Sequence, residues 1–156
     1  MSVHRSSLVD RLRLQLDAVP AVLAAADPSR LRQSPGRGQW SAFEQLAHLA
    51  RHQALFLGRI RQILDEHEPA MPSYRAELDD EWPEWRQRGL AEIVERLRKD
   101  RQRLADVVEG LSEEQLARVG VHAVLGAMPL GAWLEFFLAH AGHHLYVAFK
   151  RAHGGP

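Results

Sequence analysis

Apolar residues recur at three- and four-residue spacing in four separate stretches of the sequence, and this spacing is the period of an amphipathic helix. The pattern predicts helices over residues 8–26, 41–67 and 90–109, and a fourth from residue 129 or 130 to residue 152. No alternating pattern long enough for a useful β-strand accompanies them. We therefore expect an all-α fold, a four-helix bundle made by a single domain over residues 1–156.

Short polar motifs mark the ends of these helices. Pro20 is expected to bend the first helix, because proline lacks the amide hydrogen that a continuing helix needs. Ser41 and Glu44 form a capping-box pattern, in which each side chain bonds to the other residue's backbone amide. Ser112 and Gln115 repeat this pattern and predict a short extra helical turn after the third helix.

The connection between the second and third predicted helices is long for a small bundle. It reads PAMPSYRAELDDEWPEWRQRG, is acidic in its middle and carries several aromatic residues. Connections of this length are more often functional lids or packed crossovers than passive linkers. We expect Trp82 and Trp85 within it to cover the core of the bundle.

Composition limits the partners that the protein can have. Lysines and arginines together number 20, as do aspartates and glutamates, so no overall field favours nucleic acid or an anionic membrane. No window approaches the roughly eighteen apolar residues of a membrane span. We expect a soluble, cytoplasmic protein. The chain has no cysteine, so a metal would depend on histidines and carboxylates, and thiol chemistry would need a thiol from outside the chain.

Three histidines interrupt the apolar pattern of the last predicted helix. His140 and His144 lie about 40° apart around a helix and point into the bundle, whereas His143 lies toward the polar edge. His48 and His52 form a second pair at the same spacing on the second predicted helix. Two inward pairs could converge on one metal ion, and packed histidines without a metal are the alternative.

Two common classes of metal site do not fit these residues. A zincin needs the motif His-Glu-x-x-His, but Ala141 follows His140. A ferritin-like di-iron centre needs Glu-x-x-His motifs, and no glutamate stands three residues before a histidine. The residues leave a mononuclear, histidine-rich site with positions open for water or substrate.

Two motifs on these helices resemble the DinB superfamily, which includes proteins related to bacillithiol and mycothiol S-transferases. They are WSAFEQLAHL, residues 40–49, and HAGHHL, residues 140–145. The resemblance implies a DinB-like four-helix bundle that binds a divalent metal through His48, His140 and His144. Zinc or nickel suits such a donor set first, and iron or copper next.

The sequence departs from the family pattern at two positions. Members often carry an acidic residue where this chain has Gln53 and another where it has Ala141. The departures remove groups that could orient the metal ligands. His52 and His143 are then expected to be outer-shell or surface residues.

The resemblance implies a metal-dependent S-transferase that joins a low-molecular-weight thiol to an electrophile. Three neutral imidazoles leave the metal its full charge, so that an incoming thiol could bind as thiolate. A metal-dependent hydrolase would use water in place of the thiol. The competing class is a non-catalytic metal-binding or stress-response protein, and we also expect a homodimer.

One arginine interrupts the apolar stripe of the third predicted helix. Arg101 lies about 40° from Leu97 around the helix and should face inward. It could bind the carboxylate of a thiol or of a substrate. Alternatively, its stem packs in the bundle and its charge reaches solvent or an acidic neighbour.

Overall fold

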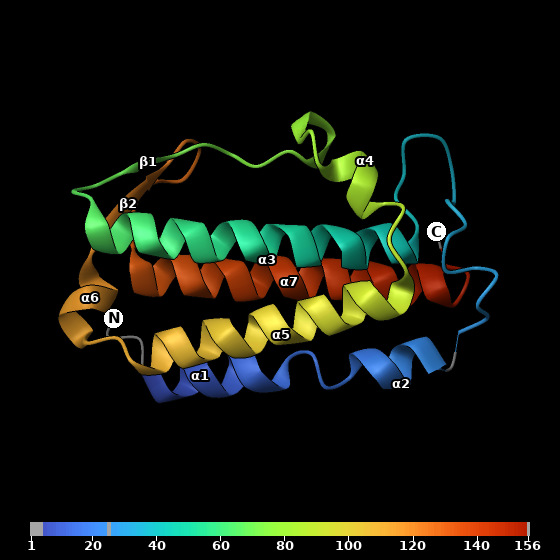
Figure 1. Cartoon of the computed structure of the whole chain (residues 1–156), viewed down its shortest axis with the longest axis horizontal. Coiled ribbons are helices and arrows are strands. Elements are labelled where there is room, and N and C mark those ends of the chain that lie inside the picture. The colour runs from blue at the N-terminus through green and yellow to red at the C-terminus, as the bar shows by residue number, and fades with distance from the viewer. Residues whose placement is uncertain (1–4, 25, 156) are drawn as a thin grey trace.

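The computed structural model, which describes residues 5–24 and 26–155, is a four-helix bundle (Figure 1). Its long helices are α1 (Arg5–Leu14), α3 (Ala42–Asp65), α5 (Leu90–Glu109) and α7 (Leu130–Ala152). Helix α3 packs against α5 and α7, and α1 closes the bundle against α5 and α7. The predicted fold and three of the four predicted helices are therefore confirmed, with α3 ending two residues before the predicted end.

The order of the helices requires a long crossover. Helices α3 and α5 run in the same direction, and α1 and α7 run opposite to them (Figure 1). After α3, whose 24 residues span about 36 Å, the chain must return over the same length before α5 can start. Residues 66–89 make this return along the outer face of α3 (Figure 1). The long connection is thus a packed crossover.

The first predicted helix is not continuous. Residues 5–14 form α1, residues 15–18 form a turn, and α2 (Val19–Ala24) follows, so the prediction of one bent helix over residues 8–26 was wrong. In a continuous helix the Pro20 ring would clash with the carbonyl of Leu16. The break therefore lies ahead of Pro20, which occupies the first turn of α2, where its missing amide hydrogen costs nothing. Residue 25 lies outside the described residues.

The crossover carries structure of its own. It contains β1 (Ala70–Met71), the 3₁₀ helix η1 (Ala76–Leu78) and the short helix α4 (Trp82–Trp85). Trp82 and Trp85 are both buried in the core, as predicted. Large aromatic side chains supply much buried apolar area, which fastens the crossover to the bundle.

Three short strands were not predicted. Strand β2 (Val119–His122) pairs with β1 in parallel, Ala70 opposite Val121, and with β3 (Gly126–Pro129) in antiparallel. Strands of two and four residues are too short to show an alternating pattern. Gly120 allows a close approach here, since a Cβ atom built on it lies 2.8 Å from Cγ1 of Ile63. The sheet ties the start of the crossover to the segment before α7.

Both predicted capping boxes are present. The Ser41 side chain accepts a hydrogen bond from the amide of Glu44, whose carboxylate accepts one from the amide of Ser41. Ser112 and Gln115 make the same pair of bonds at the start of α6 (Glu113–Ala117). The first box fixes the start of α3, two turns before His48.

Two large clusters of buried side chains fill the bundle, beside a small third one around Leu31 and Ala42. One surrounds Phe56, Trp133 and Phe137, and the other surrounds Phe43 and Leu46. The inward histidines of α3 and α7 lie where these clusters meet. Phe56 and Phe137 of the first cluster stack beside His52 with ring centroids 6.4 and 6.0 Å away, and Trp82 of the second lies 6.3 Å from His48. Within the described part of the chain, no helix is both long enough and apolar enough to span a bilayer.

Candidate metal centre

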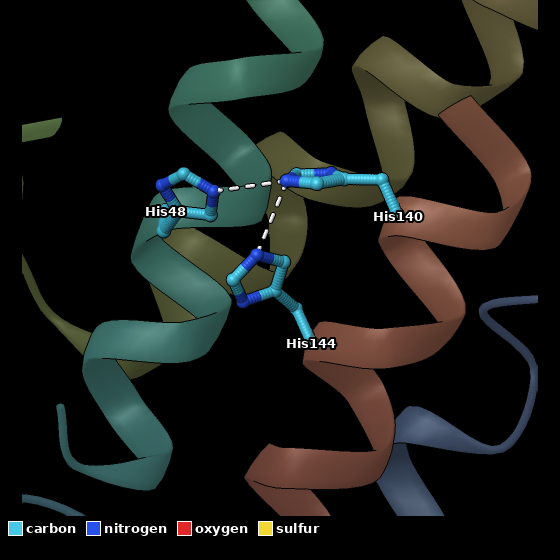
Figure 2. Close-up of side chains that lie close together, drawn as sticks. All are labelled: His48, His140 and His144. Atoms are coloured by element: carbon cyan, nitrogen blue, oxygen red, sulfur yellow. Dashed lines mark hydrogen bonds between the residues drawn. The ribbon is translucent and has the colours of Figure 1, made fainter. Parts of the chain in front are cut away.

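Three histidines from two antiparallel helices converge at one point. The Nε2 atom of His140 lies 3.3 Å from Nε2 of His48 and 3.1 Å from Nε2 of His144, as Figure 2 shows. The three nitrogens all lie within 4.8 Å of one another. Because His140 and His144 are four residues apart on α7, one turn of this helix presents two ligands to the single histidine that α3 supplies.

The spacing of these nitrogens fits a single metal ion. Two imidazole nitrogens bound to one zinc ion at 2.0–2.1 Å and at a tetrahedral angle lie roughly 3.3 Å apart. The two short contacts of His140 match that separation. Among the described residues, these histidines form the cluster that could hold an ion.

A glutamine orients one of the three imidazoles. Nδ1 of His144 lies 2.5 Å from Oε1 of Gln45, which stands three residues before His48 on α3. A carbonyl oxygen only accepts hydrogen bonds, so Nδ1 carries the proton and donates it. In the neutral ring, Nε2 of His144 then keeps its lone pair, and this lone pair faces His140.

Burial keeps the three imidazoles neutral. Desolvation lowers the pKa of His48 to about 3, with a smaller contribution from the charge of His140. Desolvation likewise lowers the pKa of His140 to about 4 and that of His144 to about 3. All three rings therefore offer lone pairs at neutral pH, which metal ligands must do.

The other two rings have no such partner. Nδ1 of His48 and Nδ1 of His140 are buried and make no hydrogen bond to any described residue. Ligating histidines usually donate this hydrogen to a carboxylate, a carbonyl or water. Among the described residues, Gln45 is therefore the one whose hydrogen bond at Nδ1 orients a ring of this cluster, that of His144.

Aromatic side chains enclose the cluster. Trp40 lies beside His48 with ring centroids 4.8 Å apart, Tyr74 stacks on His48 at 5.6 Å, and Trp82 meets its edge at 6.3 Å. Tyr74 and Trp82 both come from the crossover. The crossover thus forms one wall of the site, and it shields His48 from bulk water.

An ion pair holds this wall against α3. Nε of Arg51 donates to Oδ2 of Asp79 at 2.7 Å, and the hydroxyl of Tyr74 donates to the same oxygen at 2.9 Å. Arg51 lies on α3 between His48 and His52. Tyr74, which covers the cluster, is therefore fixed to α3, the helix that supplies His48.

The fourth inward histidine stays outside the cluster. His52 is buried, with its ring centroid 4.3 Å from that of His140, but it does not belong to the group of converging nitrogens. Burial lowers the pKa of His52 well below its usual value. His143 is exposed on α7, with its ring centroid 5.2 Å from that of His144. The two histidines lie next to the site and at the surface, as expected.

Arg101 lies elsewhere in the bundle. Its side chain is 2% exposed; Nε donates to Oε1 of Gln53 at 2.6 Å and Nη1 donates to Oε1 of Gln15 at 2.7 Å. Its Cζ lies 4.9 Å from the ring centroid of Phe137. None of the contacts within the described residues joins it to the three histidines. The stem of Arg101 thus packs in the bundle, as the second of the two interpretations expected. Its guanidinium bonds to side-chain amides, where that interpretation expected solvent or an acidic neighbour.

The two departures from the family pattern have different neighbours. Gln53 accepts from Arg101 and donates to the carbonyl of Leu97, so it acts inside the α3–α5 interface. Ala141 is fully buried in the core. Sequence reasoning missed Gln45, although its position one turn before His48 was a usable signal; no signal in the sequence placed Tyr74 against the cluster.

Comparisons with known proteins identify the family and agree with the fold. The profile of the DinB superfamily matches residues 11–148. The structure of YfiT from Bacillus subtilis, described as a probable metal-dependent hydrolase with an unusual four-helix bundle topology, is similar with a TM-score of 0.82. The likeness covers 97% of this chain and 89% of that protein at 18% sequence identity, and so concerns the fold. Comparison with curated proteins returned no match.

Proposed function

This chain belongs to the DinB superfamily, and on that premise we propose that it is a divalent-metal-dependent enzyme whose ligands are His48, His140 and His144. The observation that carries the proposal is the convergence of three Nε2 atoms at spacings of 3.1 and 3.3 Å. The bond from His144 to Gln45 supports it, because this bond directs a lone pair into the cluster.

The donor set defines the chemistry that an ion would supply. Held by three neutral imidazoles, a divalent ion would keep its full charge and lower the pKa of a thiol or a water molecule at an open position. An all-nitrogen set suits zinc, nickel, iron and copper. The residues of the chain would fix the position of the ion and exclude bulk water around it.

The proposed reaction is transfer of a low-molecular-weight thiol to an electrophile. The chain has no cysteine, so both reactants would come from outside it. Trp40, Tyr74 and Trp82 would bound the space beside the ion and hold water away from the nucleophile. Exclusion of water favours thiol transfer over hydrolysis of the same electrophile.

Hydrolysis is a second candidate. The supporting observation is the description of the similar Bacillus subtilis protein as a probable metal-dependent hydrolase. Both reactions would use the same three histidines, and they differ in whether thiol or water attacks. Binding of metal without catalysis is the outcome if neither activity is found.

The test compares metal-loaded with metal-stripped protein. A panel of small thiols is incubated with an alkylating electrophile, and a panel of esters and amides without thiol is run in parallel. Thiol consumption that depends on the metal and is lost in His140→Ala supports the transferase. Product formation without thiol supports the hydrolase, and no turnover in either panel overturns the enzyme proposal. Light scattering on the same samples tests the expected homodimer.

A further inference from the structure

A cavity lies between α3 and the crossover, beside the metal centre. Its volume is about 510 Å³. Helix α3 supplies one wall and residues 71–79 supply the other. The lining residues that matter for its chemistry are Leu55, Arg59, Met71, Tyr74, Arg75 and Leu78.

The charges around this cavity do not balance. Arg51 and Asp79, which also border it, form an ion pair, and Arg51 pairs with Glu81 as well at 3.1 Å. Arg59 and Arg75 have no carboxylate within ion-pair distance among the residues that the structure describes. Two guanidinium groups at the cavity therefore lack a paired carboxylate, which favours an anionic ligand.

Arg59 is the better placed of the two. Its side chain is half-buried, and its Nη2 atom donates to the carbonyl of Pro72 at 2.6 Å. Its Cζ lies 6.0 Å from the ring centroid of Trp133, and burial lowers the pKa of the guanidinium. The guanidinium is thus held in place, and its other N–H donors make no hydrogen bond to any residue that the structure describes, so that they can bind a carboxylate or a phosphate.

Apolar surface lies next to these charges. Leu78 is 73% exposed, which is unusual for a large apolar side chain, and Leu55 and the ring of Tyr74, both half-buried, continue the same lining. A ligand with an apolar body would cover this surface and gain from its burial. The combination of an unpaired arginine with an apolar wall selects an amphipathic anion over a simple salt ion.

We propose that this cavity binds a small amphipathic anion, a carboxylate or phosphate monoester with an apolar body, and that Arg59 is its charge partner. The site does not depend on the metal. Tyr74 nevertheless borders both places, since its ring lines the cavity, stacks on His48 with centroids 5.6 Å apart, and lies tilted beside His52 at 5.7 Å. A bound anion would therefore lie one aromatic ring away from the metal centre, where a substrate could extend from one to the other.

The probes are 3-phenylpropionate and phenyl phosphate, with the neutral 3-phenylpropanamide as the matched control. Titration calorimetry on the full chain measures each affinity, with and without a chelator. We expect at least one anion to bind at about 1 mM or tighter and at least tenfold more tightly than the amide, with or without metal. The anion that binds identifies the acid class. Equal binding of anion and amide, or binding of neither anion, overturns the proposal.

Variants separate Arg59 from general surface charge. Arg59→Met should weaken anion binding at least fivefold and Arg59→Lys by less, because lysine keeps the charge but loses the fork. Arg61→Met removes an exposed arginine outside the cavity and should change binding less than twofold. If Arg59→Met does not fold, the test is made on wild-type protein, by measuring which backbone amide NMR signals shift when the anion is added. Shifts centred on residues 55–59 and 71–78 support the site, and shifts centred elsewhere overturn it.

Discussion

Nδ1 of His144 donates a hydrogen bond to Oε1 of Gln45 across the α3–α7 interface, 2.5 Å away. Gln45 is buried and lies one turn before His48. A single glutamine therefore sets the tautomer of one ligand and stands on the helix that supplies another. The relationship makes Gln45 the first residue to test outside the histidines themselves.

Gln45→Leu should weaken metal binding about 10- to 100-fold, because His144 would lose the group that orients it. Gln45→Glu keeps an oxygen acceptor at the same place and should retain binding. Competition with a chromophoric chelator measures both affinities. Gln62→Leu, on the exposed face of α3, is the control and should match wild type. An unchanged metal affinity in Gln45→Leu would contradict the role of Gln45 in orienting His144.

In protein stripped of metal, the free energy of unfolding should fall as the pH drops from about 6.5 toward 4. Burial lowers the pKa of His48 to about 3 and that of His140 to about 4, whereas in an unfolded chain histidine titrates near 6.5. Between these values the unfolded chain binds more protons, which favours unfolding by at most about 1.4 kcal/mol per pH unit for each group.

Urea titrations at several pH values between 7 and 4 measure this dependence. The variant His140→Gln removes one of the groups, so its stability should depend less steeply on pH than that of wild type. A wild-type stability that stays constant over this range would contradict the neutral, desolvated state of the cluster.

Arg101→Ala should cost about 2 to 4 kcal/mol of stability, because the buried oxygens of Gln53 and Gln15 would lose their donor. Gln15 also donates to the carbonyl of Leu138, so the loss would spread over the contacts that join the turn after α1 to α5 and α7. Chemical denaturation measures the effect, and the metal content should not change.

The control is Arg98→Ala at an exposed position of α5, where a change within about 0.5 kcal/mol is expected. A substrate-binding role for Arg101 predicts the opposite result. In that case Arg101→Ala would leave stability intact and raise KM for an anionic substrate.

Two glycines should respond in opposite directions to alanine. Gly120→Ala should destabilise by about 1 to 3 kcal/mol, because the added Cβ would lie 2.8 Å from Cγ1 of Ile63 inside the core. Gly58→Ala, in the middle of α3 with no atom within 4 Å of its Cβ, should stabilise by about 0.5 to 1 kcal/mol. Thermal unfolding compares the two, and a neutral Gly120→Ala would show that the strand can move away from Ile63.

The long helices could be predicted because each carries enough turns of apolar spacing and clear end signals. Helix α5 begins and ends where its stripe does, and the Ser41–Glu44 box marks the start of α3. The histidines could be sorted by angle, since the rings of His140 and His144 share a face that His143 does not. The four-residue strands show no such period, and the pairing of Ala70 with Val121 joins residues too far apart in sequence for a local pattern.

The parts of the site that lie on the crossover could not be predicted. Tyr74 reaches His48 only because α3 and α5 are parallel and residues 66–89 must return along α3 (Figure 1). Arg59 has an ordinary place in the sequence of α3, and its free charge appears only once the crossover closes the cavity. The inward direction of Arg101 was predicted, but its bond to Gln15 depends on the turn at residues 15–18.

The most direct test of the central claim is the metal content of the purified protein, measured by inductively coupled plasma mass spectrometry. Wild type and His143→Ala, which changes an exposed histidine of the same motif, should each hold about one divalent ion per chain. His48→Ala, His140→Ala and His144→Ala should each retain less than about a tenth of that amount. Full occupancy in all three variants would contradict the assignment of these histidines as the metal ligands.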